Sequence, residues 1–328
     1  MNGYKKTVIS IAIISIAAAL YFFLTQQKPA SQTNALKPTQ NQEYVTPSTS
    51  ATSVIQTPQI RKFTLATSDS AALELIRQYQ SATDKRKFYD FARQQPEAGG
   101  AFLAFKVANE CMMWVSTKNS NAQQMQKWIG EIPKDSPNAA EHAAAIKKLL
   151  EPCLGFDKAP ISIKEVADMA KAARSIDPVL KIKQSISEKY DVNGDLSGIS
   201  TVISNAVKSG NPYAIQTALE TIGAGTTNYN LFSNIVGGNE LSPLDAKAFI
   251  NATTLAACQF GVDCSPESWP ALSLCPAGNC NLNLYQQIQS TMTPQEYANV
   301  MKYHTLIVDA FYKGDFDVIR VERRKFKK

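Results

Sequence analysis

The chain has 328 residues, 44% of them hydrophobic, and its 34 Lys and Arg against 28 Asp and Glu give a formal net charge of +6. Most of that charge is local, because residues 320–328 carry six basic side chains and one acid, and Lys5 and Lys6 supply two more. The rest of the chain therefore sums to −1. This distribution excludes a basic nucleic-acid-binding domain, so we expect no nucleic-acid partner.

Residues 7–24 form an apolar run of eighteen positions without a charge, directly after Lys5 and Lys6. As a helix the run would span about 27 Å, close to the roughly 30 Å hydrocarbon core of a bilayer. Basic residues ahead of such a run keep the N-terminus in the cytoplasm. We therefore predict a transmembrane anchor over 7–24, with residues 1–6 in the cytoplasm and the remainder outside.

The alternative for this run is a cleaved signal peptide, which would release the chain from the membrane. A signal peptide needs a shorter apolar stretch and small residues at its cleavage site. Here the run ends in the bulky residues 21–24, and residues 25–29 offer no A-x-A pattern. The sequence therefore favours an anchor that is not cleaved.

Residues 25–60 are rich in Gln, Thr, Ser, Asn and Pro and have few large apolar side chains. Such a segment cannot bury enough surface to offset its ordering entropy, so we predict a disordered linker. Residues 61–328 remain, which is enough for one large domain or for two smaller ones divided near 155–160.

Helix start signals recur along this domain as a capping side chain followed by proline, which is tolerated at the first helical position. Six such pairs occur: Ser136–Pro137, Asp177–Pro178, Asn211–Pro212, Ser242–Pro243, Ser265–Pro266 and Thr293–Pro294. Between them, apolar residues three and four positions apart form single faces. No convincing strand pattern is found. The sequence predicts an all-α fold, an irregular multi-helix bundle of about ten to twelve helices with a faint likeness to helical-repeat proteins.

Six cysteines lie beyond the predicted anchor: Cys111, Cys153, Cys258, Cys264, Cys275 and Cys280. An even number of cysteines in an exported domain indicates disulfides. The simplest pairing joins Cys111 to Cys153, and the spacing of the other four leaves three connectivities open. Zinc is the competing interpretation, but the gaps between the last four do not match the paired spacing of structural zinc sites. We expect no metal and no cofactor.

The stretch around these four cysteines has a distinctive layout. It runs from Ala257–Cys258 through Gly261–Cys264, Cys275 and Gly278–Cys280 to Thr293–Pro294 and the closing Lys313–Asp315. Over roughly residues 255–316 this layout resembles a group of uncharacterised helical envelope proteins of Gram-negative bacteria. The resemblance implies a periplasmic, bacterial setting and no known activity. With the predicted anchor over 7–24, we expect the domain to be held at the inner membrane.

Few residues suit catalysis. The two histidines, His142 and His304, lie in predicted helices, and Asp309 is five positions from His304, which is poorly placed for a Ser-His-Asp or Cys-His triad. Residues 191–202 begin like a calcium loop, but Leu196 and Val202 stand where an EF-hand needs glycine and glutamate. We therefore interpret that segment as a turn between helices.

Two further sets of residues offer a function. Glu97, Glu110 and Glu220 lie on predicted helices, and two carboxylates about 5–9.5 Å apart would suit a glycosidase acting on the wall. Of the tryptophans, Trp114 has apolar neighbours typical of a core, whereas Trp269 in the cysteine-rich loop is the best candidate for an exposed aromatic residue.

These observations favour a non-enzymatic function. The hypothesis is a tethered, disulfide-stabilised binding domain for another periplasmic protein or for a wall polymer such as peptidoglycan. The alternative is a wall-active hydrolase that uses paired carboxylates.

Overall fold

The computed structural model describes residues 70–112, 120–133, 135–136, 138–192, 199–225, 232–275 and 280–323. All of these belong to one contact unit, Pro58–Lys328. The predicted anchor over 7–24 and the predicted linker over 25–60 lie outside the described residues. None of the helices in the described ranges has the length and apolar character needed to cross a membrane.

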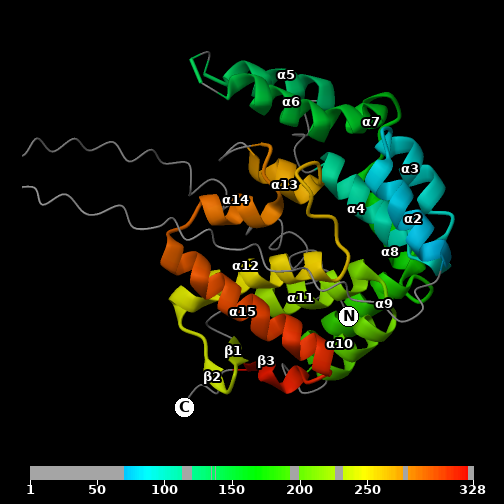
Figure 1. The fold of residues 1–328 in the computed structure, drawn as a ribbon. Helices are drawn as coiled ribbons and strands as arrows, with labels where there is room; N and C mark the ends of the chain where they lie inside the picture. The colour runs from blue at the N-terminus through cyan, green and yellow to red at the C-terminus, as the bar shows by residue number, and fades with distance from the viewer. Residues whose placement is uncertain are drawn as a thin grey trace, which may run out of the picture. The chain divides into compact units, whose positions relative to one another are not determined.

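The prediction of a mainly helical domain is confirmed (Figure 1). The first half contains α2 (Ser70–Ser81), α3 (Lys85–Ala92), η1 (Pro96–Ala98), α4 (Gly100–Met112), α5 (Asn121–Glu131), α6 (Ala139–Leu150), η2 (Glu151–Cys153), α7 (Leu154–Lys158) and α8 (Ile163–Ala173). The second half contains α9 (Pro178–Val192), α10 (Ile199–Lys208), α11 (Pro212–Gly225), β1 (Phe232–Val236), β2 (Asn239–Glu240), α12 (Pro243–Gln259), α13 (Trp269–Leu274), α14 (Leu284–Ser290), α15 (Pro294–Lys313), η4 (Phe316–Val318) and β3 (Ile319–Arg323).

Four of the predicted proline starts are helix N-termini, those of α9, α11, α12 and α15. At α15 the capping box is complete, because Thr293 Oγ1 accepts a hydrogen bond from the Glu296 N–H and Glu296 Oε2 accepts one from the Thr293 N–H at 2.8 Å. This reciprocal pair satisfies two backbone donors that the helix itself leaves free.

The predicted start at Ser265–Pro266 is wrong. Helix α13 begins at Trp269, and its cap is Ser268, whose Oγ accepts from the Ala271 N–H at 3.4 Å. The Ser268 N–H donates to the Ser265 carbonyl at 3.0 Å, so the earlier pair forms a turn instead. Of the other start, Ser136–Pro137, the proline lies outside the described residues, and α6 begins at Ala139.

Helices α11, α12 and α15 carry the main hydrophobic core. Helix α12 packs against α11 and α15, and Figure 1 shows α12 and α15 side by side. Phe249 and Leu255 of α12 and Val300 and Ile307 of α15 are fully buried at these contacts. A second apolar cluster joins α6 to α13 through Leu149, Leu150 and Leu272, and α5 covers it; its other members are Ala145, Ile146, Cys275 and Cys280.

No strands were predicted from the sequence, whereas the structure contains a small antiparallel sheet in the order β2-β1-β3. Strand β1 pairs with β2 across a two-residue turn, Gly237–Gly238, in which both residues have positive φ. That geometry is the one that favours glycine in tight hairpins. The other partner of β1 is β3, which lies far along the chain and pairs with Ile235 opposite Arg320. Short strands that pair at such a distance leave little periodic signal.

The buried carboxylate of Asp177 accepts hydrogen bonds from the first turns of two helices, α4 and α9. Asp177 Oδ1 accepts from the Val179 and Leu180 N–H groups at the start of α9, at 2.9 and 3.0 Å. Its Oδ2 accepts from the Phe102 N–H near the start of α4, at 2.8 Å. Asp177 is fully buried, and burial raises the pKa of its carboxyl group. The side chain therefore fixes the relative position of α4 and α9.

We predict that Asp177→Ala lowers the free energy of unfolding by about 3 kcal/mol, because it removes the cap and leaves buried N–H groups unpaired. Asp177→Asn should lose less, since its amide oxygen can still cap α9. The control is Ser162→Ala at the exposed cap of α8, which should cost only about 1 kcal/mol. Urea unfolding measures all three. Equal losses for Asp177→Ala and Ser162→Ala would contradict the double-cap role.

Candidate functional site

The structure pairs all six cysteines. Cys111 joins Cys153 with a Cα–Cα distance of 5.3 Å, which is the pair favoured from the sequence. For the four cysteines whose connectivity was open, neighbours pair: Cys258 with Cys264 at 5.7 Å, and Cys275 with Cys280 at 4.6 Å between Cα atoms. These separations suit disulfides.

A cavity of about 120 Å³ lies beside all three bridges. Its walls come from α2, α3, α4, α6, η2, α11, the loop after α12, and α13. The lining includes Tyr79, Lys85, Lys106, Lys148, Leu149, Pro152, Tyr213, Val262, Asp263, Glu267, Trp269 and Leu272. Pro152 precedes Cys153, Val262 and Asp263 lie between Cys258 and Cys264, and α13 leads into Cys275. The disulfides therefore staple the segments that form the cavity walls.

An ion-paired carboxylate lies behind one wall. Glu110 is 4% exposed, and its Oε2 lies 2.7 Å from Lys85 Nζ. Its Oε1 lies 3.3 Å from Lys106 Nζ, one turn earlier on α4, and accepts a hydrogen bond from the Tyr79 hydroxyl at 2.5 Å. Charged groups this deep are tolerated only when paired and hydrogen-bonded. The cluster joins α2, α3 and α4.

This pairing decides the protonation of the carboxylate. Burial alone would raise the pKa of Glu110, but the positive charges of Lys106 and Lys85 outweigh it and lower the pKa below its ordinary value. Glu110 is therefore ionised near neutral pH and has no proton to donate. Burial raises the pKa of Tyr79 and Tyr213, so both phenols keep their protons.

Three aromatic rings surround the ammonium group of Lys106. Its Nζ lies 5.6 Å from the ring centroid of Tyr213, 5.9 Å from that of Trp269 and 6.0 Å from that of Tyr79. The two tyrosine rings meet edge to face, with centroids 5.8 Å apart. A cation at this distance from ring faces is attracted by their quadrupoles. The rings come from α2, α11 and α13, so Lys106 is a common contact for three separate elements.

An ion pair crosses the edge of the cavity. Lys148 Nζ of α6 lies 2.8 Å from Glu267 Oε1, just before α13. Both side chains are largely exposed, so the pair contributes little stability. With it, the lining and the group behind it carry three cations, Lys85, Lys106 and Lys148, and three anions, Glu110, Asp263 and Glu267. The cavity is polar but balanced in charge.

The predicted glutamates do not share one environment. Glu110 is buried against two cations, whereas Glu97 on η1 and Glu220 on α11 are exposed. Glu220 Oε1 accepts a hydrogen bond from Gln216 Nε2 at 2.9 Å on its own helix. A glycosidase acid needs a raised pKa. The pKa of Glu110 is lowered by its two lysines, whereas desolvation raises the pKa of Glu220 against the opposing charges of Lys106 and Lys183.

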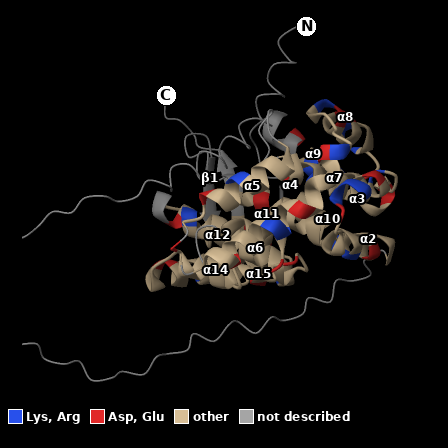
Figure 2. Ribbon diagram, turned by 90° about the horizontal axis from the view of Figure 1, so that it is seen from above, with Lys and Arg blue, Asp and Glu red and all other residues tan. Residues whose placement is uncertain are grey.

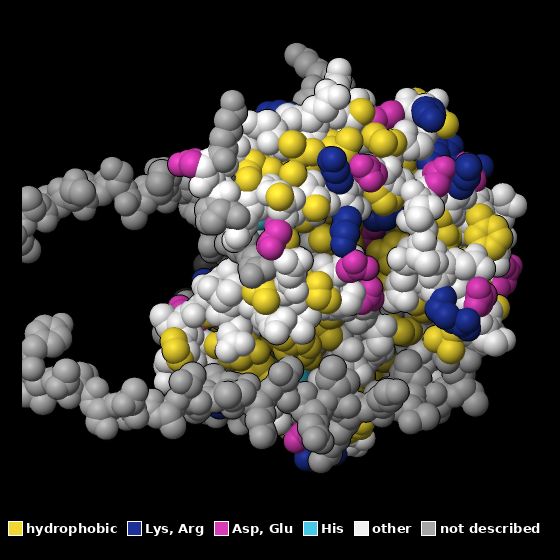
Figure 3. Space-filling view, turned by 45° about the horizontal axis from the view of Figure 1, so that its top comes forward, with side chains coloured by type: hydrophobic (Ala, Val, Ile, Leu, Met, Phe, Trp, Pro, Cys, Tyr) yellow, Lys and Arg dark blue, Asp and Glu magenta, His cyan; other side chains and the backbone are white. Residues whose placement is uncertain are grey.

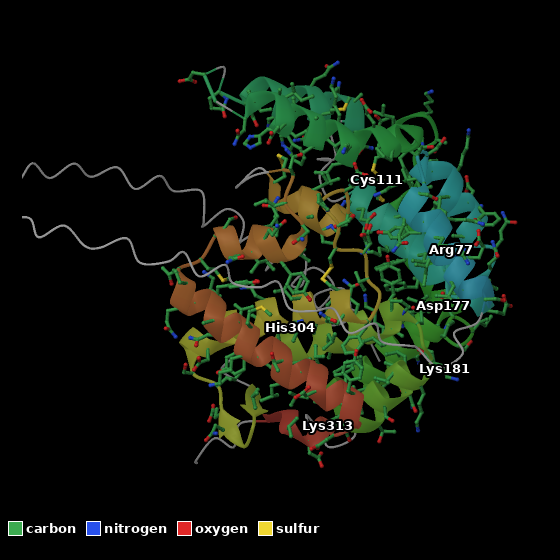
Figure 4. The ribbon with its side chains drawn as sticks, viewed as in Figure 1. Arg77, Cys111, Asp177, Lys181, His304 and Lys313 are labelled. Atoms are coloured by element: carbon green, nitrogen blue, oxygen red, sulfur yellow. A yellow bond between two sulfur atoms is a disulfide. The ribbon has the colours of Figure 1, made fainter. Side chains whose placement is uncertain are left out.

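His304 lies in the core of α15 at 4% exposure. Its Nε2 is 3.1 Å from the hydroxyl oxygen of Tyr285, and that hydroxyl donates to the Leu255 carbonyl at 3.0 Å. Burial lowers the pKa of His304 to about 4, so the ring is neutral. Figure 4 shows it among the packed helices α12 and α15. Its contacts are those of a core side chain.

The other residues predicted from the sequence are the tryptophans and the calcium-like segment. Trp269, the candidate for an exposed aromatic residue, is half-buried and lines the cavity. Trp114 and residues 193–198 of the calcium-like segment lie outside the described residues. Lys85, Lys106 and Tyr213, which also line the cavity, were not predicted from the sequence. In the view of Figure 2, Lys and Arg are interspersed with Asp and Glu over the described helices.

Comparison with known proteins gives no match: no family model, curated protein or solved structure is significantly similar to the chain. The geometry of the site is therefore the only guide to function.

We predict that Lys85→Met costs about 3 kcal/mol of unfolding free energy, because it leaves Glu110 buried with one cation fewer. Glu110→Gln should also destabilise, and the double variant should cost about 2 kcal/mol less than the sum, since the two act as a pair. Lys164→Met in the exposed Lys164–Asp168 pair is the control and should change stability by about 0.5 kcal/mol or less. Strict additivity in urea unfolding would contradict the pairing.

The pKa of His304 predicts acid sensitivity. In the unfolded chain the His304 ring is protonated near its ordinary pKa of 6.5. In the folded chain the pKa of the same ring is about 4, so it stays neutral down to that pH. Stability is therefore complete above pH 6.5 and falls as pH drops toward 4, by about 3 kcal/mol for this residue. His304→Gln should remove that part of the slope in unfolding measured from pH 7 to 4. An unchanged slope would show that another group is responsible.

Proposed function

We propose that this chain is a membrane-anchored periplasmic binding protein for a wall polymer. In this proposal residues 7–24 hold the chain in the inner membrane, residues 25–60 give it reach, and the helical domain binds an amino-sugar glycan strand. The cavity between α4, α11 and α13 receives one substituent of the strand. The observation that carries the proposal is the convergence of Tyr79, Tyr213 and Trp269 on Lys106 beside this cavity.

The chemistry of the lining supports a saccharide. A sugar ring offers apolar C–H faces that pack on aromatic rings, and hydroxyl or acetamido groups that hydrogen-bond to charged side chains. The cavity supplies both kinds of partner, and its balanced charge gives no preference for a polyanion. Figure 3 shows basic and acidic side chains lying among hydrophobic ones on the face that it presents.

The size of the cavity limits what enters it. Pockets that enclose a whole small ligand usually measure about 300–1,000 Å³. A cavity of about 120 Å³ accepts one group, while the rest of the strand lies on the surface around Trp269. Such a site suits binding to a long polymer, in which many weak contacts add, and the disulfides keep it preformed.

The protonation of Glu110 favours binding over hydrolysis. A wall hydrolase of the paired-carboxylate type needs a proton donor beside the scissile bond. In this cluster Glu110 is ionised and both of its oxygens are engaged, by Lys85 on one side and by Lys106 and Tyr79 on the other. Its role in the proposal is to orient Lys106.

The test is co-sedimentation of the purified full-length chain with insoluble peptidoglycan sacculi. Trp269→Ala should reduce binding at least tenfold, because truncating a central aromatic contact typically costs 2 kcal/mol or more. Phe91→Ala is the matched control: Phe91 is 46% exposed on α3 and does not line the cavity. Circular dichroism verifies that both variants fold.

Equal binding by wild type and Trp269→Ala would overturn the placement of the site. Binding by the chain to other envelope proteins but not to sacculi would overturn the choice of ligand. Release of soluble wall fragments by wild type, lost in Glu110→Gln, would establish the hydrolase instead.

A further inference from the structure

Three potential metal ligands meet on the side of the domain formed by α5, α6 and α13. The ligand atoms of His142, Cys275 and Cys280 all lie within 4.8 Å of one another. His142 comes from α6, and the cysteines lie at and after the end of α13. Within the described ranges no other group of three or more His, Cys, Asp or Glu residues gathers as closely. The histidine is more than a hundred residues away in the sequence, so spacing alone gives no hint of the cluster.

The surroundings suit soft ligands. Cys275 is fully buried and Cys280 is 7% exposed, and both belong to the apolar cluster with Leu149, Leu150 and Leu272. Thiolate and imidazole are the ligands that zinc prefers, and an apolar shell keeps competing water away. His142 is half-buried, and a ring nitrogen of its side chain lies beside the two sulfur atoms.

The Cys275–Cys280 bridge is a weak staple. It closes a separation of only five residues, against 42 for Cys111–Cys153. A bridge removes less entropy from the unfolded chain when its loop is shorter, so stabilisation gives little reason for this one. The Cys258–Cys264 bridge closes a similarly short separation of six residues. Among the described residues, however, no histidine gathers with these two cysteines as a possible metal ligand.

We infer that His142, Cys275 and Cys280 form a redox-gated zinc site. In the oxidised chain the two sulfur atoms are bonded to each other and the site is closed. A dithiol that reduces the bridge transfers two electrons and two protons, which yields two thiols and the dithiol's own disulfide. Zn²⁺ then displaces both thiol protons and binds two thiolates and the imidazole, and its fourth position goes to water or another ligand.

The inference of a zinc site does not rest on the proposed wall binding. The site shares α6 and α13 with the cavity, so zinc would replace the covalent bridge at the end of α13 with a coordinate one. The reduced chain would thereby keep α6 and α13 together, and the domain would remain folded in both redox states.

The experiment uses the full-length chain, reduced by a phosphine under anaerobic conditions and titrated with Co²⁺ as a spectroscopic substitute for Zn²⁺. The expected result is one equivalent of Co²⁺ with the intense absorption of tetrahedral thiolate coordination, and no binding before reduction. Cys275→Ser and Cys280→Ser should abolish it, and His142→Gln should weaken it at least tenfold. The double variant Cys258→Ser, Cys264→Ser is the control and should bind normally.

A second measurement locates the site when other bridges are also reduced. With Zn²⁺ present, mass spectrometry should show Cys275 and Cys280 protected from alkylation in the wild type, and not in His142→Gln. Protection that survives in His142→Gln would overturn the inference, as would Co²⁺ binding that depends on Cys258 or Cys264. Loss of the helical circular dichroism on reduction would also overturn it, because the folded α6 and α13 are what bring His142 to the cysteines.

Discussion

The buried carboxylate of Glu110 is the constraint on which the rest of the site depends. Burying one ionised carboxylate without partners would cost several kcal/mol, so the chain must supply compensating charges from other elements. Lys85 comes from α3, Lys106 from α4 and the Tyr79 hydroxyl from α2. Meeting this one requirement fixes three helices against one another. The next residue on α4, Cys111, forms a disulfide with Cys153 and so connects this group of helices covalently to η2.

The cavity is a consequence of that arrangement. Because Glu110 holds Lys106 in place, the ammonium group stands where the rings of Tyr213 and Trp269 can face it from α11 and α13. The disulfides then hold the surrounding loops, so little ordering is needed when a ligand binds. The same lysines that stabilise the buried carboxylate lower its pKa, so Glu110 is unsuitable as a general acid.

Local signals in the sequence predicted the fold class well. Capping residues followed by proline act within a single turn, so the starts of α12 and α15 could be read from Ser242 and Thr293 alone. Cys111 and Cys153 form a group apart from the other four cysteines, so pairing them with each other was the simplest prediction, and the structure has this pair. The start of α13 was misplaced because Ser265 and Ser268 both offer a cap within four residues. The small sheet was not predicted, because its strands are short and β3 pairs with β1 from far along the chain.

The site itself could be predicted only in part. Trp269 was identified as a candidate exposed aromatic residue between Ser268 and Pro270 of the cysteine-rich stretch, and Glu110 as a carboxylate on a predicted helix. Their partners could not be found, since Lys85 and Lys106 look like ordinary surface lysines until tertiary packing buries them. The same holds for His142, which only the packing of α6 on α13 brings to the cysteines.

The most direct test of this account is the pKa of Glu110, measured by following the chemical shift of its side-chain carboxyl carbon by NMR through an acid titration. The account predicts that Glu110 titrates below the ordinary value for glutamate, and that Lys85→Met raises the pKa. A pKa raised toward neutrality in the wild type would contradict the account, because it would mean that burial outweighs the lysines and that Glu110 can act as an acid.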